Sequence, residues 1–293
     1  MERLKPTNDF IFKKLFGETG DENILISFLN AVLKKTHKPI TEIIIDDDTE
    51  LTAEMLDDKM GRIDVRARTI EGEEIDIEVQ ITDQKNMDKR TLFYWSKLYL
   101  EGIAKGKDYK ELTKVITINI LDFEFTDIDK YHSSYHLWED EDENYRLTDI
   151  VEIHFIELPK FRRIIDKNYR EDILQMWMMF FQQDIPREVL MEMSEIEPAI
   201  KQAEDKLEYL SSDPRTIARY RARENSEHER ANIYSSGVER GLEQGLAQGI
   251  EQGLEQAKYM LAQNLLDVLD DYQIATKTGL SLEEVQELRK NNS

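Results

Sequence analysis

Hydrophobic residues return at helical spacing in three stretches of the N-terminal half. Residues 8–16 place Phe12 and Phe16 on one stripe, and residues 21–35 repeat the pattern with a wider apolar face. A third stretch, residues 88–104, combines the same spacing with many polar positions. Apolar residues that recur every three or four positions predict helices with one buried face. We therefore expect three amphipathic helices in this part of the chain.

Five other stretches have the alternation of apolar and polar residues, or the β-branched content, that is typical of strands. Residues 122–149, in contrast, are acidic and predict irregular structure. The order of these elements predicts an α/β fold in which helices pack on the faces of a mixed central sheet. The expected strands cover residues 42–46, 61–69, 74–81, 114–121 and 149–158.

The composition changes along the chain and divides it into four expected sections. Residues 168–223 read as wholly helical, with Met and aromatic residues gathered in residues 175–181. We therefore expect an all-helical C-terminal region after the α/β part. The sections are an α/β core over residues 1–160, a helical extension over 161–223, a glycine-repeat helical linker over 224–256 and a small helical unit over 257–293.

Glycines recur every four residues in the third section. Each glycine in a helix costs about 1 kcal/mol relative to alanine, so the repeat makes a helix weak. A four-residue repeat also drifts around a helix that has 3.6 residues per turn. Two interpretations remain open: a weak helical linker, or a seam of small residues that allows close contact with a second chain. The glycines are Gly237, Gly241, Gly245, Gly249 and Gly253.

The last section reads as two short helices joined by a tight turn. Gly279 is suited to end the first helix, and Ser281 with Glu284 forms a capping box that opens the second. The spacing resembles a helix-turn-helix. Its second helix is acidic, however, with Glu284 and Glu287, and would face DNA phosphates poorly. We therefore expect a structural or protein-contact unit.

The overall charge argues against a nucleic-acid role. The 293 residues include 61 acidic and 39 basic side chains, which gives a formal net charge of −22. Phosphate binding usually leaves a basic surface. Basic residues are nevertheless clustered within residues 85–110 and 160–170. Such clusters are ordinarily solvated faces, so the charge lowers the expectation of DNA binding without excluding it.

The composition also indicates in which cell compartment the protein is expected. The chain has no cysteine, so it has neither disulfides nor cysteine-ligated zinc. It contains no apolar run of the roughly 18 residues that a membrane helix needs. The first ten residues lack the apolar core of a signal peptide. We therefore expect a cytoplasmic protein without a membrane segment.

The most informative stretch is the hairpin expected over residues 61–81. If residues 70–72 form a three-residue loop with Gly72 in the left-handed conformation, polar and apolar residues fall on separate faces of both strands. A two-residue loop would mix them on each face, which the alternation forbids. The resulting cross-strand pairs are Arg68 with Glu74, Arg66 with Asp76, Asp64 with Glu78, and Arg62 with Gln80.

This register places two carboxylates, Asp64 and Glu78, directly opposite each other, with side chains roughly 5 Å apart. Like charges so placed destabilise a sheet unless a cation neutralises them. Two carboxylates, the backbone carbonyl of Val79 and water oxygens suit Mg²⁺, and Gln80 projects from the same face. The alternative, left open by the pattern, is an exposed hairpin face on which Asp64 joins a charge network with Arg62 and Arg66.

The order of elements, together with Asp64 and the Glu78-Val79-Gln80 sequence, resembles the PD-(D/E)XK nuclease core. More narrowly, the chain resembles the bacterial recombination-promoting nuclease family, also called the PD-(D/E)XK nuclease family transposases. The resemblance covers roughly residues 5–290 and is tightest over 5–125. The stretches that carry it are residues 7–17, 59–67, 75–80, 89–99, 106–121 and the glycine-repeat tail.

The resemblance implies a Mg²⁺-dependent DNA endonuclease with a restriction-endonuclease-like core, other divalent cations being possible. Asp64 and Glu78 would bind the metal, and Gln80 would stand where the superfamily usually has lysine. A neutral amide supplies no charge, so Lys59 or Lys89 would share the lysine's work. Asp9 is a further candidate acid, although it also suits the N-terminus of a helix.

The same resemblance implies double-stranded DNA as the partner, cut with low sequence preference in DNA recombination or in defence against foreign DNA. It also implies a homodimer through the C-terminal helices. Two alternatives stay open: a catalytically quiet DNA-binding or regulatory protein, and a transposase in the strict sense.

Two histidines form a weaker candidate site. His132 and His136 stand four residues apart and could share one face of a helix. No third ligand accompanies them, so a zinc site is not indicated. We expect surface or packing histidines.

Overall fold

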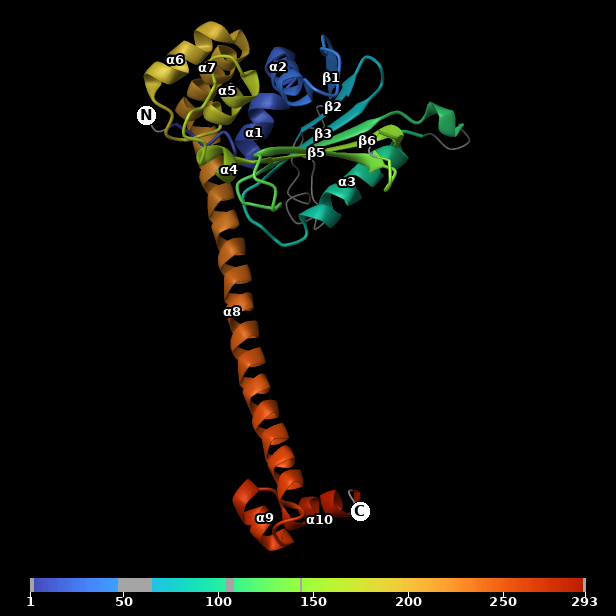
Figure 1. Cartoon of the computed structure of the whole chain (residues 1–293). Coiled ribbons are helices and arrows are strands. Elements are labelled where there is room, and N and C mark those ends of the chain that lie inside the picture. Colours follow the sequence, from blue (N-terminus) through green and yellow to red (C-terminus); the bar gives the residue numbers. More distant parts are fainter. Residues whose placement is uncertain (1–2, 47–64, 104–107, 143, 292–293) are drawn as a thin grey trace. The chain divides into compact units, whose positions relative to one another are not determined.

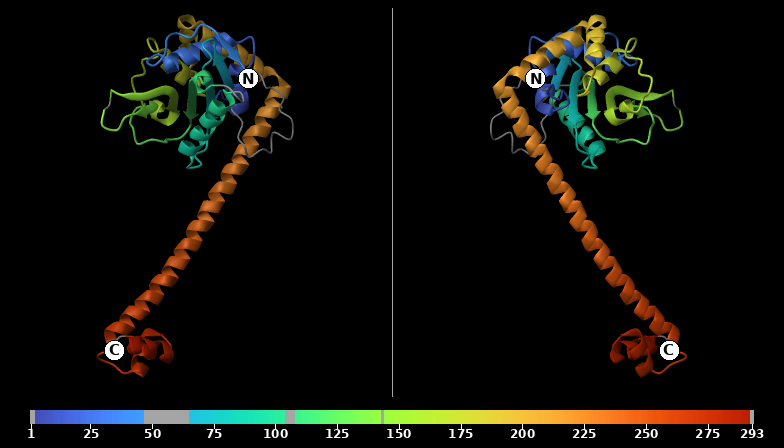
Figure 2. Two further views of the ribbon diagram at one scale, coloured as in Figure 1. Left: turned by 90° about the vertical axis from the view of Figure 1, so that its right-hand side faces the viewer. Right: turned by 90° about the vertical axis from the view of Figure 1, so that its left-hand side faces the viewer.

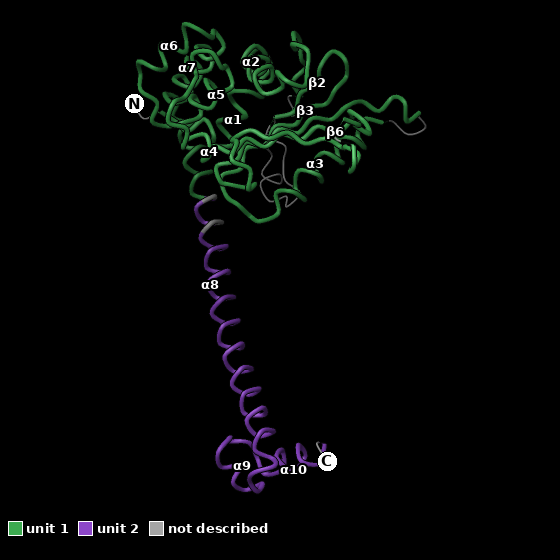
Figure 3. Tube along the Cα trace, viewed as in Figure 1, with its two compact units in different colours: residues 1–225 green, residues 226–293 purple. Residues whose placement is uncertain are grey.

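The structure is a computed structural model that describes residues 3–46, 65–103, 108–142 and 144–291 (Figure 1). The chain divides into two compact units, residues 1–225 and residues 226–293 (Figure 3). Helix α8 (Pro214–Leu265) contributes its first turns to unit 1 and the rest to unit 2. Within the described residues, no helix combines the length and the apolar character needed to cross a membrane.

Unit 1 is built on a six-stranded mixed sheet with the order β1-β2-β3-β4-β6-β5. Strands β3, β4 and β6 run parallel to one another, whereas the β1–β2, β2–β3 and β5–β6 pairs are antiparallel. This confirms the expected α/β fold with a mixed sheet. The strands are β1 (Ile43–Ile45), β2 (Val65–Thr69), β3 (Glu74–Gln80), β4 (Val115–Leu121), β5 (His132–Trp138) and β6 (Arg146–Glu157).

The β2–β3 hairpin has the register that the sequence predicts. Arg66 lies opposite Asp76, and Arg68 lies opposite Glu74. The loop is closed by a 3.0 Å hydrogen bond from the Thr69 amide to the carbonyl before β3. Gly72 has φ 87°, the left-handed conformation that only glycine adopts without strain. The three-residue loop is therefore confirmed.

The polar face of β3, however, is not the half-exposed face that alternation suggested. Glu74, Asp76 and Glu78 are all buried, because helix α3 (Met87–Glu101) lies along this face of the sheet (Figure 1). Trp95 of α3 donates from Nε1 to the carbonyl of Val115 over 3.2 Å. The polar strand face thus meets a helix and not solvent, which gives its carboxylates a low-dielectric environment.

The opposite face of the sheet carries the main apolar core, and the two side views agree with this layering (Figure 2). Apolar side chains of α1 (Asp9–Phe16) and α2 (Glu22–Leu33) are fully buried there. Trp177 packs edge-on against Phe28, with ring centroids 6.0 Å apart, and so joins the later helices to α2. Burying each such side chain stabilises the fold by about 1.5–3 kcal/mol. The later helices of unit 1 are α4 (Leu158–Arg162), α5 (Ile173–Phe180), α6 (Arg187–Ile196) and α7 (Pro198–Ser212).

The segment expected to be irregular contains strand β5 and the first residues of β6. β5 is an edge strand, and its sequence, HSSYHLW, lacks the apolar alternation of a buried strand. The loop before it is held by Lys160, which donates to the carbonyls of Thr126 and Ile128 over 2.6 Å and pairs with Glu157 at 2.8 Å. The strand is therefore fixed by contacts that are distant in sequence, which a local pattern does not reveal.

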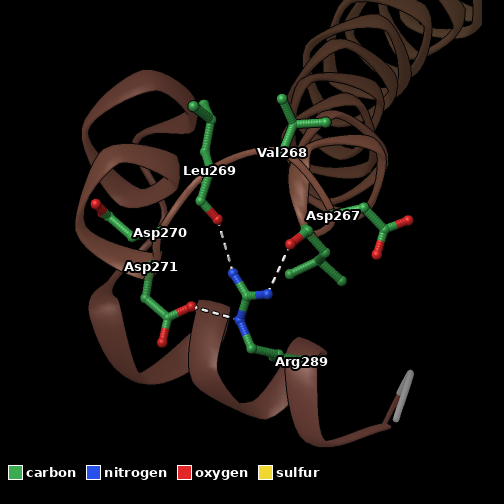
Figure 4. A pocket seen from close by; sticks show the side chains of 7 residues that line it. Asp267, Val268, Leu269, Asp270, Asp271 and Arg289 are labelled. Atoms are coloured by element: carbon green, nitrogen blue, oxygen red, sulfur yellow. Dashed lines mark hydrogen bonds and ion pairs between the residues drawn. The ribbon is translucent and has the colours of Figure 1, made fainter.

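Unit 2 closes around the C-terminal end of α8 with α9 (Asp271–Thr278) and α10 (Leu282–Asn291). Gly279 ends α9 with φ 76°, and Ser281 and Glu284 exchange the two hydrogen bonds of a capping box. Arg289 donates to the carbonyls of Leu266 and Leu269 and pairs with Asp271 beside a shallow hollow (Figure 4). Leu266 and Leu269 lie just after the last residue of α8, so these bonds hold the turn between α8 and α9.

The glycine repeat lies within α8 and is helical throughout. Apart from the adjoining backbone of α8 itself, no described atom lies within 4 Å of the position that a Cβ would occupy at any of its glycines. The apolar residue that follows each glycine is more than half exposed. These residues, which we call the α8 apolar stripe, are Val238, Leu242, Leu246, Ile250 and Leu254.

Candidate active site

Glu78 lies on the inner strand β3, on the face that α3 covers. Its side chain is 2% exposed, and Asn119 of β4 is its neighbour across the sheet. Nε of Arg90, on α3, donates to Oε2 of Glu78 over 3.0 Å. The other oxygen, Oε1, is buried and has no hydrogen-bond partner among the described residues. One oxygen of this carboxylate is therefore held by a cation, and the other is available to a ligand.

Burial sets the acidity of this group. Removal from water disfavours the charged form of a carboxylate. Burial raises the pKa of Glu78 to about 7, and the positive charge of Arg90 opposes part of that rise. A divalent cation at Oε1 would favour the charged form further, since opposite charges stabilise each other. Strongly perturbed acids of this kind are frequent at functional sites.

Gln80 ends β3 two residues beyond Glu78. The pleat of a strand places such residues on the same face. Gln80 is half-buried, and its backbone carbonyl accepts a 2.9 Å hydrogen bond from the amide of Asp122. This bond ties the end of β3 to the segment that follows β4. The side-chain amide of Gln80 is therefore at the border between the buried face of the strand and solvent.

A polar layer fixes α3 over the site. The hydroxyls of Thr91 and Thr117 lie 3.2 Å apart, and both are buried. Nδ2 of Asn119 donates to the Thr91 hydroxyl and to the carbonyl of His154, each over 3.0 Å. Buried polar groups that are satisfied in this way specify one arrangement, because losing a partner is costly. The position of α3, and with it that of Arg90, is therefore determined by strands β4 and β6.

Asp64 and Lys59 lie outside the described residues. The described pairing of β2 with β3 begins at Val65. Extending that register by one residue would place Asp64 opposite Glu78, at the separation of a directly opposed pair. That position stays a prediction.

The described residues include one candidate metal ligand, the Glu78 carboxylate. Among them, no group of three or more His, Asp or Glu side chains is arranged to hold an ion. The side chain of Val79 packs into the apolar core on the opposite face, so only its backbone carbonyl could be a ligand. Divalent cations such as Mg²⁺ take oxygen ligands, and the buried, unpartnered Oε1 of Glu78 fits that preference. A second carboxylate would have to come from Asp64.

A comparison with protein families agrees with this geometry. The sequence model of the PD-(D/E)XK nuclease family transposase matches residues 6–237, most of the chain. The chain belongs to this family. Comparisons with curated proteins and with solved structures found no match. The six-stranded mixed sheet with flanking helices agrees with a PD-(D/E)XK fold.

Membership confirms the resemblance that the sequence stretches indicated. It places the chain among nuclease-like and transposase-like proteins, for which DNA is the expected partner and divalent metals are the typical cofactors. The matched range includes both Glu78 and Gln80. That Gln80 takes the place of the superfamily's usual lysine stays a prediction.

Other residues singled out from the sequence have different surroundings. Lys89 is exposed on α3, next to Arg90 in sequence, but has no described contact with Glu78. Asp9 accepts a 2.7 Å hydrogen bond from Nε of Arg223, which ties α1 to the start of α8. Asp9 therefore forms a structural ion pair, and its role as an additional acid stays a prediction.

The two histidines lie on strand β5, so the expectation that they share a helix face is wrong. Nε2 of His132 lies 2.9 Å from Nδ1 of His154, and Nδ1 of His136 lies 3.2 Å from the carbonyl of Val151. The spacing of four residues suggested a helix because a local pattern does not reveal an edge strand. Their role as packing residues, in contrast, agrees with their contacts.

Arg90 is the site residue that sequence reasoning missed. It appeared there only as one member of a basic cluster. The available signal was its place on the helix that follows Glu78, at the start of the RTLFYW segment, where Arg90 precedes the buried Thr91. A positive residue beside a buried position is suited to neutralise a buried acid on the strand below.

Proposed function

We propose that this chain is a metal-dependent DNA endonuclease that hydrolyses phosphodiester bonds. The observation that carries the proposal is the Glu78 carboxylate, which is buried on β3 with Oε1 lacking a hydrogen-bond partner among the described residues. An isolated buried charge is costly, and the described hydrogen bond from Arg90 goes to the other oxygen, Oε2. A metal ion is the ligand that the family typically uses and that such an oxygen suits.

The proposed ligands are the carboxylates of Asp64 and Glu78 and the backbone carbonyl of Val79, with Mg²⁺ as the ion. A bound divalent cation would supply an acidified water and stabilise negative charge on a phosphate. Gln80 would orient the attacking water or a phosphate oxygen through its amide, because it stands on the same face as Glu78. Asp64 would complete the negative charge that holds the ion.

The proposed substrate is double-stranded DNA, cut with low sequence preference in the cytoplasm during DNA recombination or defence against foreign DNA. The formal net charge of −22 repels DNA at long range. Lys89 and Lys97, both exposed on α3, provide local positive charge beside the site. In the described C-terminal unit, α10 is acidic in its first turn, so it does not suit base recognition.

We further propose that two copies associate through the C-terminal helices. The α8 apolar stripe is exposed, and each of its residues directly follows a glycine of the repeat. A helix with so many glycines is intrinsically weak, so its order benefits from packing against a partner. Two copies would also bring two active sites to the two strands of a duplex.

The decisive test is a plasmid nicking assay on the full chain with Mg²⁺ and with EDTA. Asp64→Ala and Glu78→Gln should each abolish Mg²⁺-dependent nicking while circular dichroism stays that of the wild type. Glu204→Gln is the matched control, because Glu204 is a second buried glutamate paired with an arginine, Arg3, at 2.9 Å. Wild-type nicking by Glu78→Gln would remove this site from consideration.

A transposase-like activity is the alternative, because the matching family is described by that word. In that case, the DNA 3′ ends would be joined to a second duplex and not only released by water. Incubation with two labelled duplexes separates the two reactions. Joined products that depend on Glu78 would favour the alternative, and cleavage products alone favour the endonuclease. A catalytically quiet DNA-binding protein would give neither product yet would still retard a duplex.

A further inference from the structure

We propose that Arg90 is a positioning residue that fixes the Glu78 carboxylate so that Oε1 alone is presented to a divalent cation. The inference rests on the proposed function and assigns a role to a residue that does not itself bind the metal. The two carboxylate oxygens of Glu78 have different surroundings. Oε2 accepts from Nε of Arg90 at 3.0 Å, and Oε1 is buried without a hydrogen-bond partner among the described residues.

The Arg90 guanidinium, which donates to Oε2 of Glu78, is itself fixed in place. Its carbon lies 5.1 Å from the centre of the Tyr94 ring, in a cation–π contact. Tyr94 is 4% exposed, so the ring is a fixed surface. Arginine suits this role because its planar, permanently charged group can stack on a ring while donating a directional hydrogen bond. Arg90 therefore constrains the orientation of Glu78 as well as compensating its charge.

The helix that carries Arg90 is also anchored next to that residue. Thr91 bonds to Thr117 and Asn119, one residue beyond Arg90. Trp95 bonds to the backbone of β4 little more than one turn further along. Anchors on one side of the residue leave α3 little freedom to slide over β3. The Arg90–Glu78 contact is thus built into the packing of the helix.

A carboxylate in a metal site binds best when its other oxygen is already oriented by a neighbour. Such outer partners of metal ligands contribute about 10–100-fold to metal affinity. The strong, charge-assisted bond at Oε2 leaves Glu78 as a one-oxygen ligand of defined direction. Without Arg90, the side chain would lose both its counter-charge and its orientation, and the metal would bind more weakly.

The experiment measures Mn²⁺ binding to the full chain, with free Mn²⁺ followed by electron paramagnetic resonance. Arg90→Met should weaken binding about 10–100-fold, and Arg90→Lys should recover part of the loss, since it restores the charge without the planar donor. Arg3→Met is the matched control, because it removes the Arg3–Glu204 pair on other elements of unit 1. This control should bind Mn²⁺ like the wild type.

The outcomes separate this inference from the function on which it rests. If the wild type binds Mn²⁺ and Glu78→Gln does not, the metal site stands, and unchanged binding by Arg90→Met then overturns the positioning role. Tighter binding by Arg90→Met also overturns it, because Arg90 would then be a competitor of the metal. If the wild type and Glu78→Gln both fail to bind, the proposed function itself falls. Should Arg90→Met not fold, Arg90→Gln decides by the same criterion.

Discussion

At the scale of single residues, the site combines a neutral amide at the end of β3 with a cation on α3. Gln80 can donate and accept hydrogen bonds but carries no charge. Among the described residues, Arg90 is a cation that contacts Glu78, and it does so from the opposite layer. The positive charge next to Glu78 therefore comes from the helix α3 and not from Gln80 on the strand. In the proposed site, Gln80 would orient water or a phosphate oxygen.

This division predicts how Gln80 variants behave. Gln80→Ala should lower the nicking rate by roughly 10²–10³-fold, the cost of losing one donor that stabilises a transition state. Gln80→Lys should retain or increase the rate, because a flexible cation fits at this half-exposed position. Nicking rates at saturating Mg²⁺ check both. Gln286→Ala, an exposed glutamine of α10, is the control, and wild-type rates for Gln80→Ala would make Gln80 a bystander.

Individual site residues differed in how far the sequence revealed them. Glu78 and Gln80 followed from one register argument, because the period of two and a glycine turn leave a single pairing of β2 with β3. The burial of Glu78 did not follow, since it depends on α3 packing against a polar strand face. Arg90 was missed for the same reason. A contact between a helix and a strand depends on how the elements pack, which alternation within either one does not encode.

At the scale of elements, a polar cluster joins four segments on the face of the sheet opposite to Glu78. His132 of β5 lies 2.9 Å from His154 of β6, whose Nε2 donates to Glu152 over 2.8 Å. Glu152 pairs in turn with Lys114, at the start of β4, which lies 2.9 Å from Nε2 of His37 after α2. Buried polar networks specify a unique arrangement when their members are satisfied. This cluster helps to fix the edge strand β5.

The cluster makes stability depend on pH. Burial and the neighbouring His154 lower the pKa of His132 to about 3, from its ordinary value of 6.5. The charges of Lys35 and Lys130 act in the same direction, and that of Glu152 acts against them. Below pH 6.5 the unfolded chain therefore binds a proton that the folded chain rejects. The free energy of unfolding should fall by a few kcal/mol as the pH decreases from about 6.5 towards about 3.

Glu152 adds to this acid sensitivity. Burial alone would raise its pKa, but hydrogen bonds from His154 and Lys114 more than offset that effect and hold the pKa below its ordinary value of 4.5. Its contribution to stability is present above pH 4.5 and is lost as the pH falls further. Urea unfolding at a series of pH values measures the combined effect of His132 and Glu152 on the free energy of unfolding. In His132→Gln, this free energy should depend less on pH between pH 6.5 and 4.5. Parallel curves for this variant, or equal flattening by the exposed His228→Gln, would contradict the assignment.

The predictability of the elements follows from where their contacts lie. The glycine turn at Gly72 and the capping box at Ser281 were predicted because they form within a few residues. Strand β4, buried on both faces, was predicted from its apolar run. Strand β5 was missed because its hydrogen-bond partner β6 and the Lys160 contacts determine its place, and its own sequence is polar.

At the scale of the whole molecule, the geometry of the glycine repeat limits how two copies can pair. A four-residue repeat advances about 40° around a helix at each step, since four residues turn it by about 400°. The α8 apolar stripe therefore winds around the helix and does not form the straight seam of a long coiled coil. Ridges four residues apart pack best when two helices cross at about −50°. A dimer through this stripe should make contact over only a few turns.

That geometry predicts an effect of alanine that a linker would not show. In the single chain, no described atom outside the adjoining α8 backbone lies within 4 Å of a Cβ at Gly241, Gly245 or Gly249. Each Gly→Ala change should therefore stabilise the helix by about 1 kcal/mol. If two helices cross closely, the same methyl group blocks their approach. We expect rising helicity by circular dichroism together with a shift towards monomer by light scattering. The shift should be concentrated at one or two neighbouring glycines, where the helices cross.

Two further proteins complete this test. Gln248→Ala raises the helix propensity of the same helix without adding a methyl group at a glycine. It should therefore raise helicity and leave the oligomeric state unchanged. A chain ending at residue 225 keeps unit 1 whole and should be monomeric, bind Mn²⁺, and lose double-strand cutting before nicking. If every Gly→Ala protein and the shortened chain keep the oligomeric state of the full chain, α8 does not join two copies. In that case, the glycine repeat is a linker, and any dimer must form through unit 1.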